Sequence, residues 1–239
     1  MINIPKWLIK KIFNSFKVDV VRLSNTPKHS LLGLTNCPIR TIIDVGANEG
    51  QFAKEILKVF PGAHLYCFEP LPEAFKKLNQ WAEKQKGRIS AFNYALGDQD
   101  GVFEIFNHLH HSPSSSLLKT TEVCERHYPF TKEQVSVQVK VTTLDNWIDS
   151  LSAPLSHDIL VKLDVQGYED KVIRGGKKIL SVAKACLVEI NLDQLYEEQP
   201  TFKDLFSLLS DLGYHFCGNL DQVYDDDGHV IYIDAVFVR

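Results

Sequence analysis

The chain has 239 residues, of which 44% are hydrophobic and 23% are charged, as in an ordinary globular domain. Its formal net charge of -4 argues against a nucleic-acid binder, which usually carries a basic stripe, and favours a small-molecule substrate. The five cysteines have no CxxC spacing, so we expect neither disulfides nor a metal site, and the predicted location is the reducing cytoplasm. We find no signal-peptide pattern, and no apolar run reaches the roughly 18 residues of a membrane span.

The first predicted element is an amphipathic helix over residues 4–23. Apolar residues recur at helical spacing between lysines, namely Leu8, Ile12, Phe13, Phe16 and Val20. We expect this stripe to pack on the domain or on a second subunit of a homodimer. Peripheral contact with a membrane is the alternative, because the helix is both basic and aromatic. Residues 24–38 are interpreted as a linker or cap, which divides the chain into 1–38 and a catalytic domain over 39–239.

Strands and helices alternate from residue 40 to residue 96. The predicted strands are 41–45, 63–68 and 89–96, and the predicted helices are 51–60 and 72–85. Pro61 and Gly62 end the first of these helices, and Gly87 ends the second. This βαβαβ order implies a parallel sheet with right-handed crossovers.

The remainder of the chain alternates less regularly. Its predicted strands are 101–106, 135–141, 159–163, 185–190, 223–224 and 230–238. Its predicted helices are 144–151, 168–180 and 202–212. A polar loop over residues 107–121 follows the first of these strands, and the last two strands flank a turn at residues 225–229, as in a hairpin.

The segment Asp44-Val45-Gly46-Ala47-Asn48-Glu49-Gly50 joins the first strand to the first helix of the alternating region. Its glycines let the backbone pass close to a ligand, and open parallel sheets bind ligands at the carboxyl ends of their strands. A dinucleotide site needs the motif GxGxxG, whereas this chain has Asn48 at the position of the second glycine. The acids Asp44 and Glu49 also disfavour a pyrophosphate, and a sulfonium cation with an amino-acid tail fits better.

Glu69 ends the next strand, where a carboxylate can accept hydrogen bonds from both hydroxyls of a ribose. Such a bond to a charged group contributes about 1.5–3 kcal/mol. The alternative is an acid exposed to solvent at a strand end. Beyond the third strand, the turn at Ala95, Leu96 and Asp98 lies where an adenine is expected, and Asp98 is either a reader of its amino group or a simple turn former.

Lys162, Asp164 and Gln166 follow a buried strand at the same edge of the sheet. Their period of two places them on one side, and a buried charge needs a partner, so we expect a Lys162–Asp164 ion pair. Glu169 begins the next helix, where its structural alternative is to serve the helix N-terminus. Glu189 ends the following strand as a second acidic candidate. With Asp164 it offers two ligands to Mg²⁺, although two acids alone do not make a site.

Three histidines, His108, His110 and His111, precede the serine-rich stretch at residues 112–116. Metal binding and base catalysis are two alternatives for these histidines. The preferred interpretation is that they are solvated side chains on a mobile lid. The acceptor pocket is expected to come from the least patterned segments, 1–38 and 107–134. The sequence therefore does not identify the acceptor.

These motifs, in this order, resemble the FkbM family of S-adenosylmethionine-dependent methyltransferases over roughly residues 40–193. The matching segments are 43–50, 68–70, 93–98, 115–117, 141–145 and 162–169. The resemblance implies a Rossmann-like, seven-stranded and mostly parallel sheet with helices on both faces and an antiparallel last strand. It also implies methyl transfer to a hydroxyl of a sugar, glycan or small natural product. The family commonly has Glu where this chain has Gln166, so no acid–base role is expected there.

The residues and the resemblance together predict two sets of site residues. S-adenosylmethionine is expected to be bound by Asp44, Gly46, Ala47, Asn48, Gly50, Glu69, Pro70, Ala95, Leu96, Asp98 and Asp164. At the reacting end, Asp164 or Glu189 is expected to act as the base, and Lys162 to hold the local charge. Two alternatives stay open, namely a nicotinamide-dependent oxidoreductase on the same type of sheet and a catalytically silent cofactor-binding protein.

Overall fold

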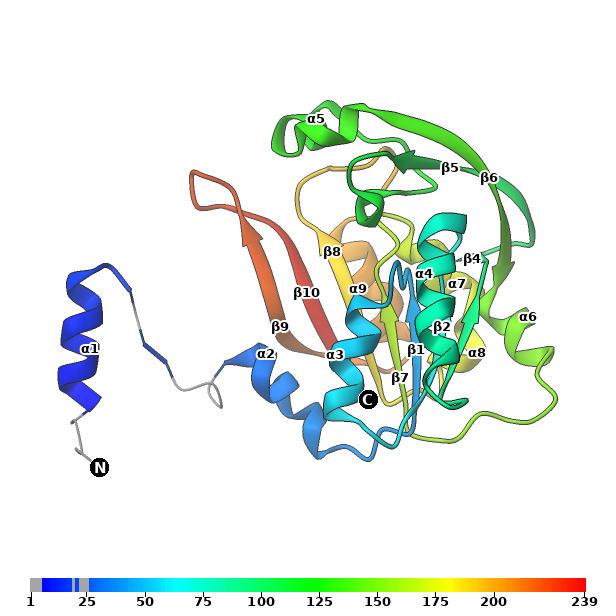
Figure 1. The fold of residues 1–239 in the computed structure, drawn as a ribbon, viewed down its shortest axis with the longest axis horizontal. Helices are drawn as coiled ribbons and strands as arrows, with labels where there is room; N and C mark the ends of the chain where they lie inside the picture. The colour runs from blue at the N-terminus through cyan, green and yellow to red at the C-terminus, as the bar shows by residue number, and fades with distance from the viewer. Residues whose placement is uncertain (1–5, 19, 22–25) are drawn as a thin grey trace.

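The computed structural model of the chain describes residues 6–18, 20–21 and 26–239. Within them, one seven-stranded sheet has the order β3-β2-β1-β7-β8-β10-β9 (Figure 1). The strands are β1 Thr41–Val45, β2 His64–Phe68, β3 Ile89–Phe92, β7 Ile159–Leu163, β8 Ala185–Asn191, β9 His215–Tyr224 and β10 Val230–Val238. Strands β3 to β8 in this order are parallel, and β10 is antiparallel to β8 and β9. This confirms the predicted sheet and its antiparallel last strand.

Helices cover both faces of this sheet, because alternate residues of a strand point to opposite faces. On β1, Ile42 packs into a core with α3 and α4, whereas its neighbour Ile43 packs into the core on the other face with α6, α7 and α9. The helices are α3 Gln51–Val59, α4 Pro72–Glu83, α6 Leu144–Asp149, α7 Glu169–Gly175, α8 Lys177–Leu180 and α9 Phe202–Asp211. Strands buried on both faces have continuous apolar sequences, which explains why the sequence predicts them well.

A second, three-stranded sheet has the order β4-β6-β5. Its strands are β4 Ala95–Gly97, β5 Gly101–His108 and β6 Gln134–Thr143. The single strand predicted over residues 89–96 is therefore wrong. The chain leaves the main sheet at Asn93, whose side-chain amide donates to the carbonyls of Glu69 and Pro70, each at 2.9 Å. Such bonds from side chain to backbone compete with strand pairing, and β4 instead pairs with β6.

The helix predicted over residues 168–180 is two helices, α7 and α8, which are separated at Gly176. Gly175 ends α7 and lies directly against Gly97 of β4. A Cβ on Gly175 would come within 1.9 Å of the Gly97 carbonyl oxygen, so only glycine permits this approach of helix to strand. Two successive glycines also have low helix propensity, which explains the break.

The C-terminal hairpin is longer than predicted. The sequence predicts only residues 223–224 for its first strand, whereas β9 begins at His215. Polar residues such as Asn219 and Asp221 interrupt the apolar alternation of β9, and this hides the strand from a pattern search. In contrast, β10 is largely buried and carries a clear apolar pattern.

Between β5 and β6, residues 109–133 form a cover segment above the carboxyl ends of the main sheet (Figure 1). It contains η3 Ser112–Ser114, α5 Glu122–His127 and η4 Pro129–Lys132. Thr121 caps α5 through its side chain, which accepts from the backbone N–H of Cys124. Thr121 also donates its own backbone N–H to Leu195 at 2.9 Å, so the cover segment is joined to the loop after β8.

The helix predicted over residues 4–23 is shorter in the structure, where α1 is Lys6–Ser15. Part of the predicted helix, residues 4–5, 19 and 22–23, lies outside the described residues. Trp7 is 65% exposed and Phe16 is 73% exposed. Figure 1 shows α1 standing apart from the domain, so its described apolar residues do not pack on the domain as expected.

The chain enters the domain through α2 (Pro27–Ser30) and η2 (Leu31–Asn36). Leu31 and Leu34 are buried in the core below β1, and Lys28 pairs with Asp221 of β9 at 2.8 Å. The division of the chain at residue 39 stays a prediction. No helix among the described residues is long and apolar enough to cross a membrane. All five cysteines are free.

Candidate functional site

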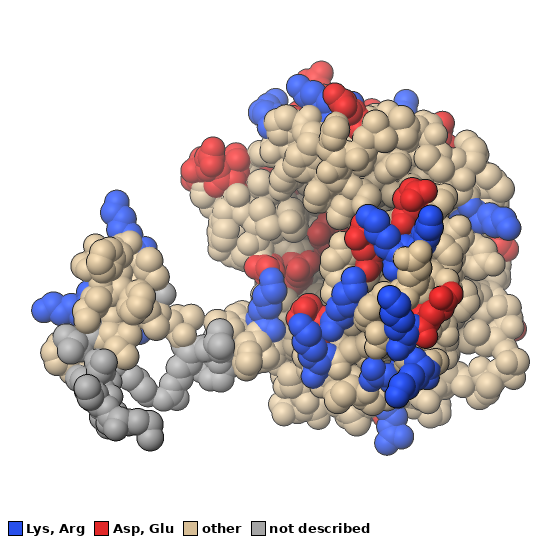
Figure 2. Space-filling view, viewed as in Figure 1, with Lys and Arg blue, Asp and Glu red and all other residues tan. Residues whose placement is uncertain are grey.

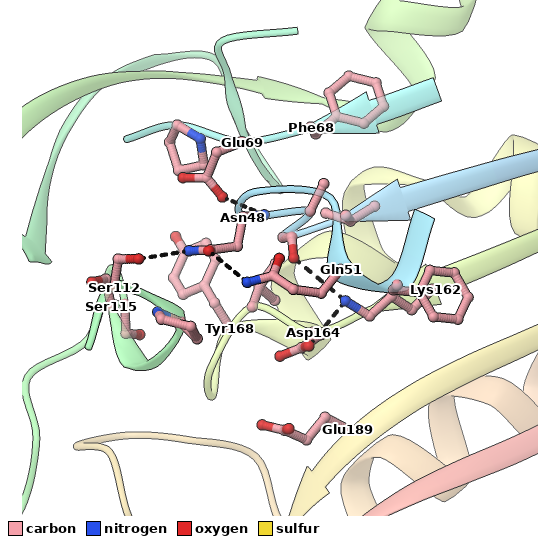
Figure 3. Close-up of a pocket in the computed structure, with 18 of the residues that line it drawn as sticks. Asn48, Gln51, Phe68, Glu69, Ser112, Ser115, Lys162, Asp164, Tyr168 and Glu189 are labelled. Atoms are coloured by element: carbon pink, nitrogen blue, oxygen red, sulfur yellow. Dashed lines mark hydrogen bonds and ion pairs between the residues drawn. The ribbon is translucent and has the colours of Figure 1, made fainter. Parts of the chain in front are cut away.

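A cavity of about 550 Å³ opens at the carboxyl ends of β1, β2, β7 and β8, beneath the cover segment. Its volume lies within the about 300–1,000 Å³ of small-molecule sites, and open parallel sheets bind ligands at this edge. Its lining includes Gly46, Glu69, Asp164 and Glu189 (Figure 3). Predicted motifs that are far apart in the sequence therefore meet in one space.

The loop after β1 approaches the backbone after β7 so closely that only glycine fits. Gly46 has a φ of 80°, and a Cβ on it would lie 1.9 Å from the carbonyl oxygen of Asp164. Gly46 and Ala47 donate their N–H groups to the carbonyl of Phe68 at 3.1 and 2.9 Å, and Gly50 donates to Ala47 at 2.8 Å. These amides are engaged within the protein and cannot cradle a pyrophosphate, which supports the argument against a dinucleotide.

Glu69, at the end of β2, is a buried carboxylate held by two backbone amides. Its Oε2 accepts from the N–H of Asn48 at 2.9 Å, and its Oε1 accepts from the N–H of Leu71 at 2.8 Å. Burial raises the pKa of Glu69 to about 7, although these two hydrogen bonds act in the opposite direction. Each oxygen keeps a further lone pair, so the two hydroxyls of a diol such as ribose are suitable partners.

Asn48 connects the glycine-containing loop to the cover segment. Its Nδ2 donates to Ser112 Oγ at 3.0 Å, and its Oδ1 accepts from Gln51 Nε2 at 3.1 Å (Figure 3). Through Ser112, Ser115 and Ser116, the serine-rich stretch lines the cavity. The roles of Gln51 and Ser112 are not predicted from the sequence, because their partners come from different segments.

Lys162 is the central cation of the site and lies between two carboxylates. Its Nζ is 2.9 Å from Asp164 Oδ2 and 3.3 Å from Asp44 Oδ1, which confirms the predicted Lys162–Asp164 pair. Burial lowers the pKa of Lys162, but the carboxylates of Asp164 and Asp44 outweigh it, and the pKa is raised overall. Asp44 is fully buried, and neither of its oxygens has a hydrogen-bond partner in the described part of the chain, so its charge depends on Lys162.

Gln166 links the two carboxylates of the reacting end. Its Nε2 donates to Asp164 Oδ1 at 2.8 Å and to Glu189 Oε1 at 2.5 Å, and its Oε1 accepts from the hydroxyl of Tyr196 at 2.6 Å. Both hydrogens of the amide are thus used to hold acids. A glutamate in place of Gln166 would add negative charge here instead, so the departure from the family pattern has a structural role.

Two acids at this end of the cavity, Glu189 and Asp234, have raised pKa values. Burial raises the pKa of Glu189 well above its usual 4.5, and the nearby carboxylates of Asp164 and Asp234 raise it further. Asp234 faces Glu189 across the β8–β10 pair, and burial followed by the charge of Asp164 raises the pKa of Asp234 to about 6. Asp234 is not predicted from the sequence, because it lies in the middle of an apolar strand.

Three of the predicted cofactor-binding residues do not line the cavity. Asp44 lies beneath it under Lys162, Gly50 begins α3, and Asp98 is exposed. Pro70, Ala95 and Leu96 do line it, so the predicted turn reaches the cavity through these residues and not through Asp98. Aromatic lining residues that the sequence does not predict are Tyr94, Tyr168 and Tyr232.

Two further residues singled out from the sequence, Glu169 and His108, are buried. Glu169 is buried at the start of α7, where its Oε1 accepts from the N–H groups of Val165 at 3.0 Å and Gly167 at 3.2 Å. These bonds hold the turn before α7, and the predicted role of Glu169 at the N-terminus of the helix stays a prediction. His108 is 1% exposed, so its predicted solvation is wrong, because it ends β5 beneath the cover segment, whereas His110 and His111 are exposed.

Known proteins share this sequence pattern and fold. The family model of the methyltransferase FkbM domain matches residues 44–216. The chain is 28% identical over 188 residues to the 2-O-methyltransferase NoeI of Sinorhizobium fredii, covering 75% of this chain and 74% of that protein. It is 25% identical over 148 residues to the hexuronic acid methyltransferase AglP of Haloferax volcanii, covering 62% of this chain and 54% of that protein.

A solved structure agrees in fold. The crystal structure of a methyltransferase FkbM from Methylobacillus flagellatus is similar, with a TM-score of 0.53 and 14% identity. The likeness covers 84% of this chain and 44% of that one, so the chain spans less than half the length of that protein. The family match also decides between the two enzyme classes in favour of methyl transfer over nicotinamide chemistry. The chain belongs to the FkbM methyltransferase family.

Proposed function

We propose that the protein is an S-adenosylmethionine-dependent O-methyltransferase that methylates a hydroxyl of a sugar, either free or within a glycan or natural product. The observation that carries this proposal is the single cavity with Glu69 and the glycine-containing loop at one end and Lys162, Asp164 and Glu189 at the other. The names of the relatives NoeI and AglP, a 2-O-methyltransferase and a hexuronic acid methyltransferase, support an oxygen acceptor on a sugar.

The residues present fit S-adenosylmethionine. Glu69 offers its free lone pairs to the ribose hydroxyls, and Ala95 and Leu96 offer an apolar surface to the adenine. Gly46 and Ala47 line the cavity next to Glu69 and are the proposed neighbours of the amino-acid tail. When bound, this cofactor supplies an electrophilic methyl group on a sulfonium.

Asp164 and Glu189 are the proposed acceptors of the hydroxyl proton. Both line the cavity, and Figure 3 shows both side chains on the opposite side of Asn48 and Gln51 from Glu69. Lys162 pairs with Asp164 at 2.9 Å, whereas burial raises the pKa of Glu189. Gln166 fixes the orientation of both carboxylates and so contributes to alignment of the acceptor, which is a large factor in bimolecular transfer.

The charge of the cavity favours a neutral sugar over a uronate. Among the described residues, the lining acids are Glu55, Glu69, Asp164, Glu189, Asp221 and Asp234, whereas the lining bases are Lys28 and Lys162. Figure 2 shows acidic atoms in the hollow beside the β9–β10 hairpin. Carboxyl groups accept hydrogen bonds from sugar hydroxyls, but they repel a carboxylate of the acceptor.

The first experiment separates cofactor binding from transfer. Calorimetry with S-adenosylhomocysteine and with NAD is expected to show binding of the former alone. Transfer of a radiolabelled methyl group is then measured on matched neutral and uronic acid glycans, and the neutral series is expected to be labelled faster. Binding without transfer to any acceptor in glycan, lipid and metabolite extracts would instead favour a silent cofactor-binding protein, and tight binding of NAD alone would overturn the proposal.

We expect Asp164→Asn to lower kcat by about 10²–10⁴-fold, because it removes a general base, while the affinity for S-adenosylhomocysteine changes little. Glu189→Gln is measured in parallel, and the larger loss of kcat identifies the base. Asp211→Asn, an exposed change on α9, is the matched control and should keep wild-type turnover. If both cavity variants keep full turnover, neither carboxylate takes part in the chemistry.

The exposed apolar residues of α1 support a role for residues 4–23 in contact with a membrane surface or a second copy of the chain. The helix is not needed to complete the cavity, because its described residues do not line it. The predicted cytoplasmic location stays a prediction.

A further inference from the structure

A second group of titratable side chains lies outside the cavity, where three segments of the chain meet. His127 ends α5 of the cover segment, Asp193 follows β8, and Asp225, Asp227 and His229 form the turn between β9 and β10. Figure 2 shows acidic atoms gathered at the tip of this hairpin. The group is not visible in the sequence, because its members are separated by up to about a hundred residues.

The two histidines share one carboxylate oxygen. Asp193 Oδ2 lies 2.9 Å from His127 Nε2 and 3.0 Å from His229 Nε2. An N–H on each Nε2 is therefore held by Asp193. The Nδ1 atoms face another carboxylate, since His127 Nδ1 is 3.5 Å from Asp225 Oδ1 and His229 Nδ1 is 4.0 Å from Asp225 Oδ2.

We propose that His127, Asp225 and His229 bind a divalent cation of the zinc type. Each of them offers one ligand atom within 4.8 Å of the others. Ligand atoms held about 2.0–2.1 Å from a tetrahedral Zn²⁺ lie roughly 3.3 Å apart, so small side-chain movements close the site. Two imidazoles with a carboxylate suit zinc, whereas Mg²⁺ and Ca²⁺ prefer oxygen ligands.

Asp193 is not one of the three proposed ligands, but its carboxylate lies next to both histidines. A histidine that binds a metal through one ring nitrogen usually donates the other N–H to a carboxylate, which fixes its tautomer and orientation. Asp193 does so for both histidines at once. The Asp227 carboxylate, 2.5 Å from His229 Nδ1, must leave that nitrogen when the metal binds, and the three proposed ligands leave a fourth position on the metal open.

The cation would join two walls of the cavity. The cover segment contributes Ser112 and Leu117 to the lining, and the hairpin strands contribute Val223 and Tyr232. Below the proposed site, Cys124 of α5 packs with residues of the hairpin and of the loop after β8 in a small apolar core. A bound metal therefore holds the cover segment against the hairpin and fixes the shape of the acceptor end.

The test measures binding of the metal alone to the full-length protein after chelation and dialysis, without cofactor or acceptor. We expect one Zn²⁺ per chain, and with Co²⁺ as the probe the strong visible absorption of tetrahedral coordination. His229→Ala and Asp225→Asn should abolish saturable binding, and Asp193→Asn should weaken it by about 10–100-fold. Zn²⁺ should also raise the Tm of the wild type but not that of His229→Ala.

The matched control is His110→Ala, which removes another exposed histidine of the cover segment that is paired with an acid, Glu133. It should bind Zn²⁺ as the wild type does. The inference is overturned if the wild type takes up no stoichiometric Zn²⁺ or if His229→Ala binds it equally well. Thiolate absorption in the Co²⁺ spectrum overturns it as well, because the metal would then lie on cysteine. These readouts do not depend on methyl transfer.

Discussion

At the scale of single residues, Lys162 is the shared counter-ion of two carboxylates, Asp164 and Asp44. It pairs with Asp164 at the cavity and with Asp44 beneath it, and Asp44 has no hydrogen bond of its own among the described residues. Removing one partner of a buried pair leaves an uncompensated charge, which is far more costly than removing both. Lys162 thus supports the fold as well as the proposed chemistry.

We expect Lys162→Met to lower the free energy of unfolding by about 3–5 kcal/mol, because Asp44 is left buried without a counter-ion. The double variant Asp44→Asn, Lys162→Met should recover most of this loss. Urea unfolding measures both, with Lys58→Met as a control in an exposed pair, where the expected change is within about 0.5 kcal/mol. A loss at Lys162 no larger than at Lys58 would contradict the argument.

The sequence predicts the individual acids and bases of the site better than their connections. Lys162 lies in β7 and Asp164 follows directly after it, two residues apart, so their pairing follows from local geometry. Gln166 is also on this edge, but its contacts with Glu189 and Tyr196 depend on how β7, β8 and the loop after β8 pack together. Asp98 matches a position of the family motif, yet it is exposed at the surface.

At the scale of elements, the contact between α7 and β4 attaches the small sheet to the main body. Gly175 meets the Gly97 carbonyl without room for a side chain. We expect Gly175→Ala to destabilise the protein by at least about 1–3 kcal/mol, because α7 must move away from β4. Gly62→Ala is the matched control, since nothing lies within 4 Å of its Cβ, and its unfolding midpoint should stay close to the wild type. Equal midpoints for both variants would show that α7 adapts without cost.

Glu169 makes the turn into α7 sensitive to pH. Burial raises its pKa from the usual 4.5 to about 8, so between these values the folded chain holds a proton that the unfolded chain has lost. The stability contributed by this group is therefore complete below pH 4.5 and falls as the pH rises to about 8. From pH 6 to pH 9 the wild type should lose on the order of 2–3 kcal/mol through Glu169 alone.

The variant Glu169→Gln keeps an oxygen for the N–H groups of Val165 and Gly167 but has no proton to lose. Its unfolding free energy should therefore depend less on pH than that of the wild type by the same amount. Denaturant unfolding at pH 6 and pH 9 checks this, with the exposed change Glu197→Gln as a control that keeps the wild-type dependence. Parallel curves for all three proteins would exclude Glu169 as the source.

The elements with continuous apolar sequences are predicted within a few residues, whereas those that depend on tertiary contacts are not. Strands β1 and β7 are buried on both faces, and a single pattern specifies each of them. The division of residues 89–97 into β3 and β4 depends instead on the hydrogen bonds of Asn93, and the length of β9 depends on β10 beside it. The local sequence pattern predicts neither the hydrogen bonds of Asn93 nor the pairing of β9 with β10.

At the scale of the whole molecule, the domain and α1 are separate in space (Figure 1). Deletion of residues 1–25 should therefore change the Tm by less than about 2 °C, because the described apolar side chains of α1 are largely exposed. The same deletion should abolish either co-sedimentation with anionic vesicles or dimerisation in size-exclusion chromatography. A fall of several degrees in Tm would mean that the segment packs on the domain after all.

The fold class, the sheet with its antiparallel last strand and the family are all predicted from the sequence, because ordered motifs on alternating strands and helices restrict the topology strongly. The pairing of the second sheet, the helices of the cover segment and the full length of the hairpin are not. These are the parts that surround the acceptor end of the cavity, and they have the weakest periodicity.

The position of β10 has a consequence for the order in which the protein folds. β10 is the last strand along the chain, yet it lies between β8 and β9 within the sheet. During synthesis, β9 has no neighbour in the sheet until β10 has left the ribosome, whereas β1, β2 and β3 pair with one another early. We therefore expect the strands around Glu69 to be able to pair before the wall formed by Asp221, Tyr232 and Asp234 is complete.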